Sequence, residues 1–429
     1  MATDPVEQVT VETFPGAGAA DLLAEARRLA ALAPGPDLPY LSATIDLSPE
    51  GGRPDRRPGR AVFDRAVADQ IAAMPAHDPA RLGLEAALER ATAALDGLEP
   101  SVLGALVVCG GPNGVAETIP ASLPLPNRLA FGPTPALLDL VRLAEDESSY
   151  AVVVADQRDA ELLVVSAASP DLQVSVQASA YPGKQEQGGW SQRRYQARAD
   201  ERLEAFARTL AQETRRLVES GRVTSIVVAA DEPMRSALKH EFHQMVTDKL
   251  VGEVAVMLDA APRTVVDRTQ AVVDAAERGR ESAAVQAVAD GAGPGGRSVA
   301  GAVETLTALQ TGQVMTLVMN DDFQAAGWAD FNLGSYGVGE PPAEHPAGGD
   351  PADLRPVALE QELVRQALLT GAEIEIVRTL APVDPGEATG DRRGADRGRT
   401  EAARQLDGLG GVGATLRFTL ASDRSTAEM

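Results

Sequence analysis

The chain has 429 residues and a formal net charge of -23 at pH 7. Domains typically hold roughly 100–200 residues, so we expect two to four domains rather than one core. A hydrophobic fraction of 44% excludes wholesale disorder, because the chain can bury enough apolar surface to fold. The excess of 62 acidic over 39 basic residues argues against a general DNA-coating protein, which needs positive charge.

The cysteine and histidine content limits the chemistry of the chain. Cys109 is the only cysteine, so no intramolecular disulfide can form, and with four histidines no Cys/His zinc cluster can be assembled. We therefore predict no metal site and no cofactor. The N-terminus lacks the pattern of a secretory signal, and no stretch approaches about 18 uninterrupted apolar residues. We expect a cytoplasmic protein without a membrane partner.

The first part of the chain predicts a flexible tail over 1–20 and an α/β domain over 21–146. A helix with apolar residues on one face starts at Asp21, which we place as its N-cap. Helices alternating with apolar, strand-like runs are typical of an α/β domain. The predicted elements are a strand at 40–47, helices at 61–74 and 79–95, and a strand at 103–108.

The second part, 147–261, predicts a central α/β domain. Two apolar runs flank Asp156-Gln157-Arg158-Asp159, the pattern of a tight hairpin. Glycines and polar residues then break all periodicity over 181–196, and a long amphipathic helix follows and ends before Gly221. The predicted elements are strands at 151–155, 160–165, 173–178, 222–229 and 250–258, and helices at 199–219 and 233–245.

The third part predicts another α/β domain over 262–420, followed by a tail over 421–429. Two insertions rich in glycine and proline, 334–350 and 383–400, are predicted to be mobile surface loops. The predicted elements are helices at 263–289, 299–312 and 359–369, and strands at 314–319, 373–377 and 413–420. The fold class expected for the whole chain is α/β, in three domains.

Two glycine-rich segments resemble nucleotide-binding loops in spacing but not in context. In Gly291–Ser298, Arg297 stands where the phosphate-loop mechanism needs lysine, and a helix rather than a strand precedes the segment. The segment Gly408–Gly413 leads into a strand, whereas a dinucleotide loop opens a helix. We interpret the second segment as a turn before a strand, and we predict a nucleotide site in neither.

His240 and His243 lie three residues apart on a predicted helix, with Glu241 between them. Two imidazoles on one helix face could bind a metal ion, but no third ligand is identifiable in the sequence. A solvated helix face is therefore the favoured interpretation.

The segment from Lys184 to Arg222 reverses the global charge, with nine basic and six acidic residues. Gly188 and Gly189 lie in a polar loop, and Arg193 and Arg194 follow at once, before the long helix. Such a loop could extend backbone and a few polar side chains toward a polyanion. Composition alone favours a plainer interpretation, a flexible loop that precedes an ordinary charged helix.

The motif Gly188-Gly189-Trp190-Ser191-Gln192-Arg193-Arg194-Tyr195 resembles the catalytic loop of archaeal and eukaryotic class-one peptide release factors. It is still more similar to the Gly-x-x-Gln loop of Vms1-type peptidyl-tRNA hydrolases and of bacterial relatives of release factors. The hairpin, loop, helix and strand of 147–261 follow the order of that family's central domain. The resemblance implies a release-factor or Pelota-like arrangement of three domains, with an L7Ae-like third domain over 262–420.

The resemblance also implies roles for individual residues. Gln192 is the candidate catalytic residue that positions water, with Gly188 and Gly189 shaping the loop. An uncharged amide can donate and accept hydrogen bonds without the desolvation cost of an ion. Trp190, which occupies the glutamine position of Gly-Gly-Gln, is a candidate for stacking on a base or for blocking the site. The candidate RNA-binding residues are Trp190, Arg193, Arg194 and Arg198.

The function implied is rescue of stalled ribosomes by hydrolysis of peptidyl-tRNA. The partners implied are the ribosomal A site, rRNA and peptidyl-tRNA, with an elongation-factor-type GTPase as a further candidate. The alternative is a non-enzymatic, Balon-like hibernation factor that occupies the vacant A site. A third hypothesis is a general stress protein that does not bind ribosomes. No decoding motif of the Asn-Ile-Lys-Ser kind occurs in the first domain, which argues against stop-codon reading.

Overall fold

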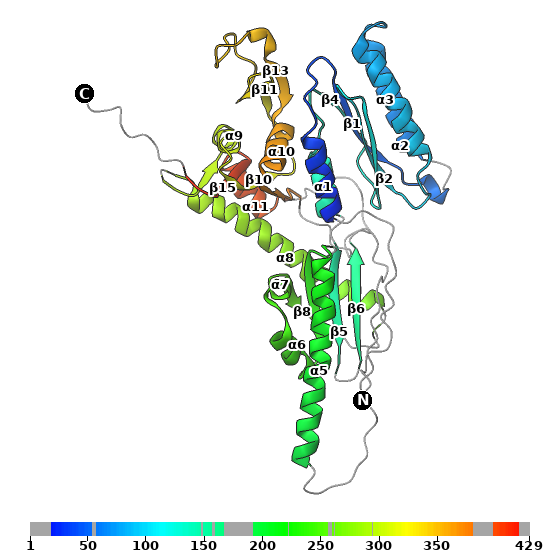
Figure 1. Cartoon of the computed structure of the whole chain (residues 1–429), viewed down its shortest axis with the longest axis vertical. Helices are drawn as coiled ribbons and strands as arrows, with labels where there is room; N and C mark the ends of the chain where they lie inside the picture. The colour runs from blue at the N-terminus through cyan, green and yellow to red at the C-terminus, as the bar shows by residue number, and fades with distance from the viewer. Residues whose placement is uncertain are drawn as a thin grey trace, which may run out of the picture. The chain divides into compact units, whose positions relative to one another are not determined.

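The computed structural model describes residues 19–53, 57–146, 149–156, 159–166, 192–221, 223–255, 260, 262–293, 295–380 and 398–419. Figure 1 shows their helices and strands coloured along the chain. The chain divides into two compact units. We call Met1–Leu23 with Leu143–Arg278 the central unit, and Ala24–Arg142 with Gly279–Met429 the flanking unit. Three helices contain a boundary between the units: α1 (Ala19–Ala30), α4 (Leu138–Asp146) and α8 (Pro262–Gly291).

The central unit is built on a four-stranded sheet in the order β6-β5-β7-β8. The predicted hairpin is confirmed, because β5 pairs antiparallel with β6 in full register. β7 is parallel to β5 and to β8. Nearly every residue of β5 and β7 is buried, because the sheet is covered on both faces. Strands in this position are expected to be continuously apolar, and both are rich in valine and alanine. The strands are β5 (Ser149–Ala155), β6 (Ala160–Ser166), β7 (Ser225–Ala230) and β8 (Leu250–Glu253).

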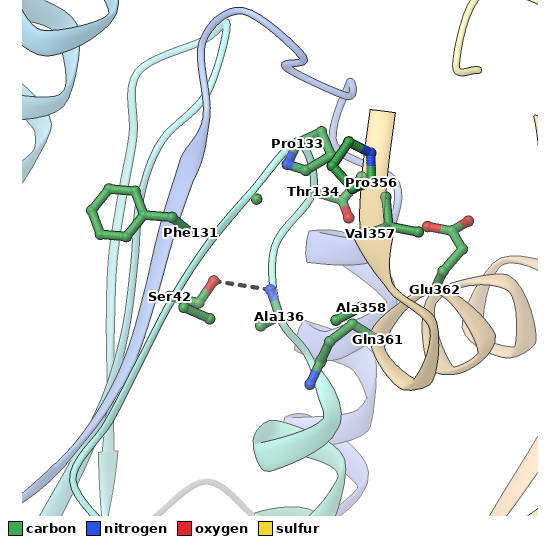
Figure 2. Close-up of a pocket in the computed structure, with 12 residues that line it drawn as sticks. Ser42, Phe131, Pro133, Thr134, Ala136, Pro356, Val357, Ala358, Gln361 and Glu362 are labelled. Carbon is green, nitrogen blue, oxygen red and sulfur yellow. Dashed lines mark hydrogen bonds between the residues drawn. The ribbon is translucent and has the colours of Figure 1, made fainter. Parts of the chain in front are cut away.

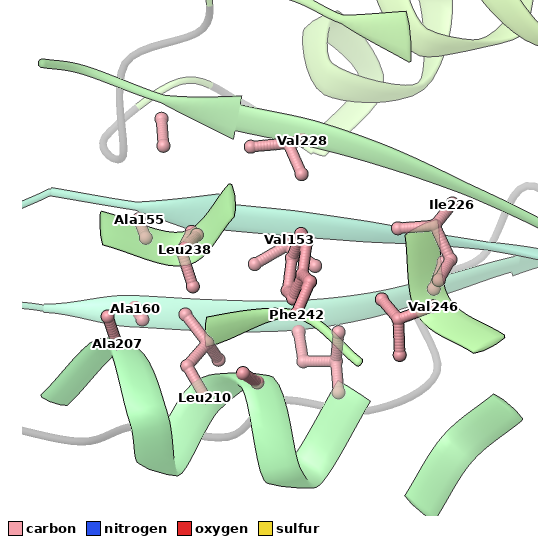
Figure 3. Close-up of a cluster of buried hydrophobic side chains, with 14 of the residues drawn as sticks. Val153, Ala155, Ala160, Ala207, Leu210, Ile226, Val228, Leu238, Phe242 and Val246 are labelled. Carbon is pink, nitrogen blue, oxygen red and sulfur yellow. The ribbon is translucent and has the colours of Figure 1, made fainter. Parts of the chain in front are cut away.

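Two hydrophobic clusters fill the two faces of this sheet. Side chains alternate along each strand, so Val153 belongs to one cluster and Val152 to the other. The first cluster includes side chains of α5 (Gln192–Glu219), α6 (Met234–Glu241) and α7 (Gln244–Thr247), as Figure 3 shows. The second includes side chains from the first half of α8. There, Tyr150 Oη lies 3.0 Å from Thr269 Oγ1 in a buried hydrogen bond.

The single helix predicted over 233–245 is wrong, because the chain turns between α6 and α7. Phe242 has an extended backbone that places its ring in the first core cluster, where it is buried. His243 then caps α7, since its Nδ1 accepts a hydrogen bond from Met245 N at 3.2 Å. The strand predicted to reach 258 ends at Glu253, and the strand predicted at 173–178 lies outside the described residues.

The first part of the flanking unit is an antiparallel sheet in the order β3-β2-β1-β4. Two helices pack on it through Phe63, Val67 and Leu84, which share a core cluster with strand residues. The predicted helices and strands are present, but α1 begins before Asp21, which lies in its first turn and is not its N-cap. The elements are β1 (Tyr40–Asp46), η1 (Glu50–Gly52), α2 (Pro58–Ala73), α3 (Pro79–Asp96), β2 (Gly104–Gly110), β3 (Val115–Ala121) and β4 (Arg128–Gly132).

The second part of the flanking unit holds two further sheets, in the orders β14-β10-β15-β9 and β12-β11-β13. The last strand is shorter than predicted and ends at Leu416. Gly408 follows α11, and the turn before β15 is confirmed. The elements are β9 (Ser298–Ala300), α9 (Ala302–Gln310), β10 (Val314–Asn320), β11 (Ala326–Asp330), β12 (Ser335–Val338), η2 (Pro351–Asp353), β13 (Arg355–Ala358), α10 (Leu359–Thr370), β14 (Glu373–Val377), α11 (Glu401–Asp407) and β15 (Val412–Leu416).

The segment 334–350, predicted to be a mobile loop, contains strand β12 and His345, whose imidazole forms a buried hydrogen bond with Asp330 of β11. His345 Nδ1 accepts a hydrogen bond from Ala347 N, so Nε2 carries the proton and donates to Asp330 Oδ2 at 3.0 Å. Burial alone would raise the pKa of Asp330, but backbone N–H donors from Leu333 and Asn332, with His345, lower it below its usual range. Each side chain of the pair is 1% exposed. The pair therefore fixes the segment on β11.

The α/β fold class is confirmed by these mixed sheets and helices. The division into domains at 21, 147 and 262, and the L7Ae-like character of the third, stay predictions. The other predicted loop, 383–400, lies mostly outside the described residues.

Candidate functional site

The predicted site residues lie around the beginning of α5. Gly188, Gly189 and Trp190 are outside the described residues. α5 begins at Gln192, seven residues before the helix start predicted from sequence. Arg193, Arg194 and Arg198 are therefore helical, in the first two turns, where a loop was predicted through 196. The side chains of 192–200 are outside the description, so only the backbone places them.

The later part of α5 holds the helix on the central unit. Phe206, Leu210 and Val218 are buried in the first core cluster and recur at the spacing of one helix face. Figure 3 shows Leu210 and Ala207 on α5 facing the strands. The position of the helix is thus set by its part from Phe206 to Val218.

The early part of α5 precedes these anchors. Leu203 is the first described side chain of the helix that packs on the core, and Phe206 is the first that is buried. Residues 192–202 come before Leu203 and correspond to about 16 Å of helix at 1.5 Å per residue. Figure 1 shows this end of α5 beyond the ends of β5 and β6. We call 192–202 the tip of α5.

The sequence around the tip is positively charged. Residues 187–199 contain Arg193, Arg194 and Arg198 and no aspartate or glutamate. A helix N-terminus already carries partial positive charge, so cations in its first turn do not stabilise the helix. No acidic residue in the first turn of α5 compensates this charge. The first N–H groups of a helix have no partner within the helix, so together with the arginines they make this end suited to an anion.

The arginines in the body of α5 are paired with acids. Arg208 contacts Glu241 of α6 at 3.2 Å, and this carboxylate raises the pKa of Arg208. Arg215 forms an ion pair with Glu219 at 2.7 Å. Arg216 likewise forms an ion pair with Glu213. The basic excess counted over 184–222 is therefore not spread along the helix but is concentrated near its tip.

The flanking unit contains a cavity of about 300 Å³, drawn in Figure 2. Its polar groups bind backbone N–H groups at the N-terminal end of α4. Ser42 Oγ accepts a hydrogen bond from Ala136 N at 2.9 Å. Gln361 Oε1 accepts from Leu137 N and Leu138 N at 2.9 and 3.1 Å. These contacts cap a helix and do not align a nucleophile with a base. The lining residues are Ser42, Ala130, Phe131, Gly132, Pro133, Thr134, Ala136, Pro356, Val357, Ala358, Gln361 and Glu362.

Glu362 is the acidic residue of this lining, and it is held within α10. Its Oε1 accepts hydrogen bonds from Arg365 Nη1 at 3.0 Å and from Gln366 Nε2 at 2.7 Å. Burial raises the pKa of Glu362, against the opposing effect of Arg365. A carboxyl group held in this way supports the helix, so the cavity is a weaker candidate for chemistry than the tip of α5.

Two further classes of site find no support in the described part of the chain. No three His, Cys, Asp or Glu side chains there come together as a metal ion requires. None of the described helices has the length and apolarity needed to cross a membrane. His243, considered above as a metal ligand, is instead the cap of α7.

Comparison of the sequence with known families gives one match. Residues 135–274 match the sequence profile of bacterial archaeo-eukaryotic release factor family 10. This range contains β5, β6, the predicted loop, α5, β7 and the first part of α8. No curated protein is similar to the chain in sequence at a significant level.

Several solved structures resemble the chain at low identity. Archaeal translation termination factor aRF1 is 16% identical over 94% of this chain and 98% of its own, with a TM-score of 0.24. Archaeal Pelota, in a model of its ribosome-bound form with ABCE1, is 15% identical over 96% and 99%, with a TM-score of 0.37. Dom34 of S. cerevisiae, a translation termination-like factor, is 12% identical over 72% and 75%, with a TM-score of 0.40. All three scores are below 0.5, so the profile match is the firmer relationship.

Proposed function

Because this chain is a bacterial relative of the archaeal and eukaryotic release factor class through residues 135–274, we propose that it is a ribosome-associated factor that hydrolyses peptidyl-tRNA on stalled ribosomes. The observation that carries the proposal is that this family segment includes the tip of α5, in which Gln192 lies about 16 Å before the first described core contact of the helix. A slender, positively charged end is what a factor needs to reach an ester surrounded by RNA.

The chemistry asked of the protein is modest. Within the ribosome, rRNA and the tRNA 3′ end supply most of the positioning and electrostatic stabilisation for ester hydrolysis. The protein must add a group that holds the attacking water. The amide of Gln192 can accept one hydrogen bond from that water and donate another to RNA. Gly188 and Gly189 allow close backbone approach in this proposal.

The basic residues supply binding rather than chemistry in this proposal. Arg193, Arg194 and Arg198 meet phosphates of rRNA or tRNA at the vacant A site, and Trp190 stacks on a base. The paired arginines in the body of α5 are less suited to this role, because a phosphate would have to displace the carboxylate partner that each already has. An elongation-factor-type GTPase is the proposed delivery partner.

The first experiment tests the chemistry with a matched pair of variants. Gln192→Ala should abolish release of nascent peptide from ribosome-bound peptidyl-tRNA, while ribosome affinity stays nearly unchanged, since one amide contributes only about 0.5–1.5 kcal/mol. Gln192→Glu should be equally inactive, because a carboxylate cannot donate and is repelled by phosphate. The control is Gln196→Ala, the same side chain one turn further along α5, which should release peptide normally. Equal activity of Gln192→Ala and the wild type would refute the assignment.

The second experiment tests the RNA contacts through their salt dependence. Replacing Arg193 and Arg194 with alanine should lower the log–log salt slope of ribosome binding by up to about two units, about one for each lost phosphate contact. The control replaces Arg215 and Arg216, which are paired with Glu219 and Glu213. If both double variants change the slope equally, the tip is not the RNA-binding part of the helix.

The second candidate function is ribosome hibernation without chemistry. The observation that favours it is Trp190, which stands where Gly-Gly-Gln loops have glutamine. In this case the wild type should bind empty ribosomes tightly and release no peptide, and Trp190→Ala should weaken binding by roughly 1–3 kcal/mol. Sedimentation with purified ribosomes, with and without P-site peptidyl-tRNA, separates the two functions. If the protein neither sediments with ribosomes nor releases peptide, both candidate functions are refuted.

A further inference from the structure

Two sheets of the flanking unit present an edge strand to the same cavity. β4 is the last strand in the order β3-β2-β1-β4, and β13 is the last in the order β12-β11-β13. The cavity of about 300 Å³ is lined by residues of both strands, as Figure 2 shows. On the outer side of an edge strand, backbone N–H and C=O groups have no neighbouring strand to bind. The register of each strand decides which groups these are.

On β4, the free groups are those of Phe131. Leu47, which directly follows β1, donates its N–H to Leu103 O on the side of β2. Successive residues of a strand bond to opposite sides, so the odd-numbered residues of β1 bond to β2 and the even-numbered ones to β4. Phe131 lies opposite Leu41, an odd-numbered residue. Its N–H and C=O therefore point away from β1, and neither has a partner in the described ranges.

On β13, the free groups are the C=O of Pro356 and the N–H of Ala358. Leu359 N donates to Ala325 O on the side of β11, so Val357 also bonds to β11 and its two neighbours do not. A proline is tolerated at position 356 because no ladder N–H is needed there. Neither free group has a hydrogen-bond partner among the residues that the structure describes.

The rest of the lining is apolar or uncharged, apart from one residue. Gln361 Oε1 accepts two backbone N–H groups, which fixes the orientation of the amide, and its Nε2 has no acceptor in the described part of the chain. Glu362 is the charged residue of the lining, and Arg365 holds its carboxylate. Phe131 and Pro133 contribute apolar surface. The cavity therefore suits an uncharged group that both donates and accepts hydrogen bonds, as a peptide backbone does.

We propose that this cavity is a docking groove for an extended, uncharged segment of a partner protein, whose backbone pairs with the free groups of β13 and β4. In strand addition, main-chain hydrogen bonds supply affinity and the lining selects the side chains. A second copy of this chain is not the occupant, because its own β4 and β13 edges lie in the same concave site. This inference goes beyond the proposed function and does not depend on it.

The test uses a substitution that removes a single N–H from the groove. Ala358→Pro fits the backbone, because Ala358 has a φ of -72° and proline requires about -65°. The probe is a heptapeptide that is selected on the full-length protein from a random phage-displayed library and then synthesised with a fluorescein label. Fluorescence anisotropy should show an affinity about two- to tenfold lower for Ala358→Pro than for the wild type.

Ala358→Gly is the matched control, because it changes the same residue and keeps the N–H, so its affinity for the probe should equal that of the wild type. Circular dichroism checks that both variants are folded. N-methylation of the central residue of the probe removes an N–H from the other partner and should also weaken binding. The proposal is overturned if no peptide is selected or if Ala358→Pro and Ala358→Gly bind the probe equally. A wild-type dimer that Ala358→Pro dissociates would also overturn it, because the edges would then pair with a second copy.

Discussion

α5 and α8 are of nearly equal length, at 28 and 30 residues, and contribute to opposite faces of the same sheet, yet they are held differently. α5 is anchored from Leu203 onward, and its first residues precede every described core contact. α8 has buried side chains near both ends, and no residue from 274 to 280 is buried. The position of the buried side chains therefore decides whether a long helix is held by packing at both ends, as α8 is, or starts before its first described core contact, as α5 does.

The largest expected effect comes from removing an anchor of α5. Phe206→Ala should lower the free energy of unfolding of the central unit by about 3–5 kcal/mol, because it leaves a cavity in the first core cluster. Glu201→Ala, at an exposed position in the tip, should change it by less than about 0.5 kcal/mol. Urea denaturation followed by circular dichroism measures both. Similar losses would mean that the tip is anchored as well.

An anchor of α8 can be tested through the buried Tyr150–Thr269 hydrogen bond. Thr269 donates to Val265 O, so Tyr150 donates to Thr269, and burial raises the pKa of Tyr150, which keeps its proton in place. Thr269→Val leaves the tyrosine hydroxyl without an acceptor and should cost about 1–3 kcal/mol of unfolding free energy.

The control for this hydrogen bond is the double variant Tyr150→Phe, Thr269→Val. It removes both polar partners, so urea denaturation should recover most of the stability lost in the single variant. If the double variant loses as much unfolding free energy as the two single variants together, the hydrogen bond does not hold α8 on the sheet.

The open space around Gly279 in α8 predicts a small gain in stability on substitution. Gly279→Ala should raise the free energy of unfolding by about 0.5–1 kcal/mol, since alanine loses less backbone entropy and meets no neighbour. Gly83→Ala should gain a similar amount. Thermal unfolding of the two variants measures this, and a loss of stability in Gly279→Ala would show that position 279 is packed in solution.

The smallest expected effect is at the surface of α5. Arg215→Ala removes the ion pair with Glu219 and should cost only about 0.3–0.5 kcal/mol, because the Arg215 side chain is 46% exposed. The loss should vanish in about 1 M salt, where the screening length is near 3 Å. A larger loss that persists in high salt would place Arg215 among the anchors of the helix.

The sequence could predict a structural feature where neighbouring residues determine it, but not where contacts between distant residues do. The β5–β6 hairpin was predictable because two apolar runs flank a polar turn. The break between α6 and α7 was not, because Phe242 leaves the helix to reach a core that only the tertiary fold creates. Strand β12 was missed for a similar reason, since a four-residue strand with Gly337 shows no alternation, and its segment is fixed by the distant pairing of His345 with Asp330.

The candidate site shows the same division. The motif around Gln192 was visible in the sequence, but the start of α5 was misplaced, because polar residues and two glycines conceal periodicity. The charge count over 184–222 was also misleading. The pairing of Arg208 with Glu241 joins residues 33 positions apart, and such neutralisation follows from the packing of α5 against α6, which composition does not reveal.

If Gln192 positions the attacking water as proposed, the length of the tip sets how accurately its side chain can be placed. If α5 tilts by about 10° at Leu203, its first residue moves by about 3 Å, which is the full length of a hydrogen bond. A misplacement of about 1 Å can already cost a hundredfold in rate. The placement of Gln192 therefore depends on the stiffness of the first core cluster, which holds α5 from Leu203 onward. In that proposal, substitutions among the buried residues of this core that leave the protein folded should still lower the rate of peptide release, because Gln192 is then held less firmly.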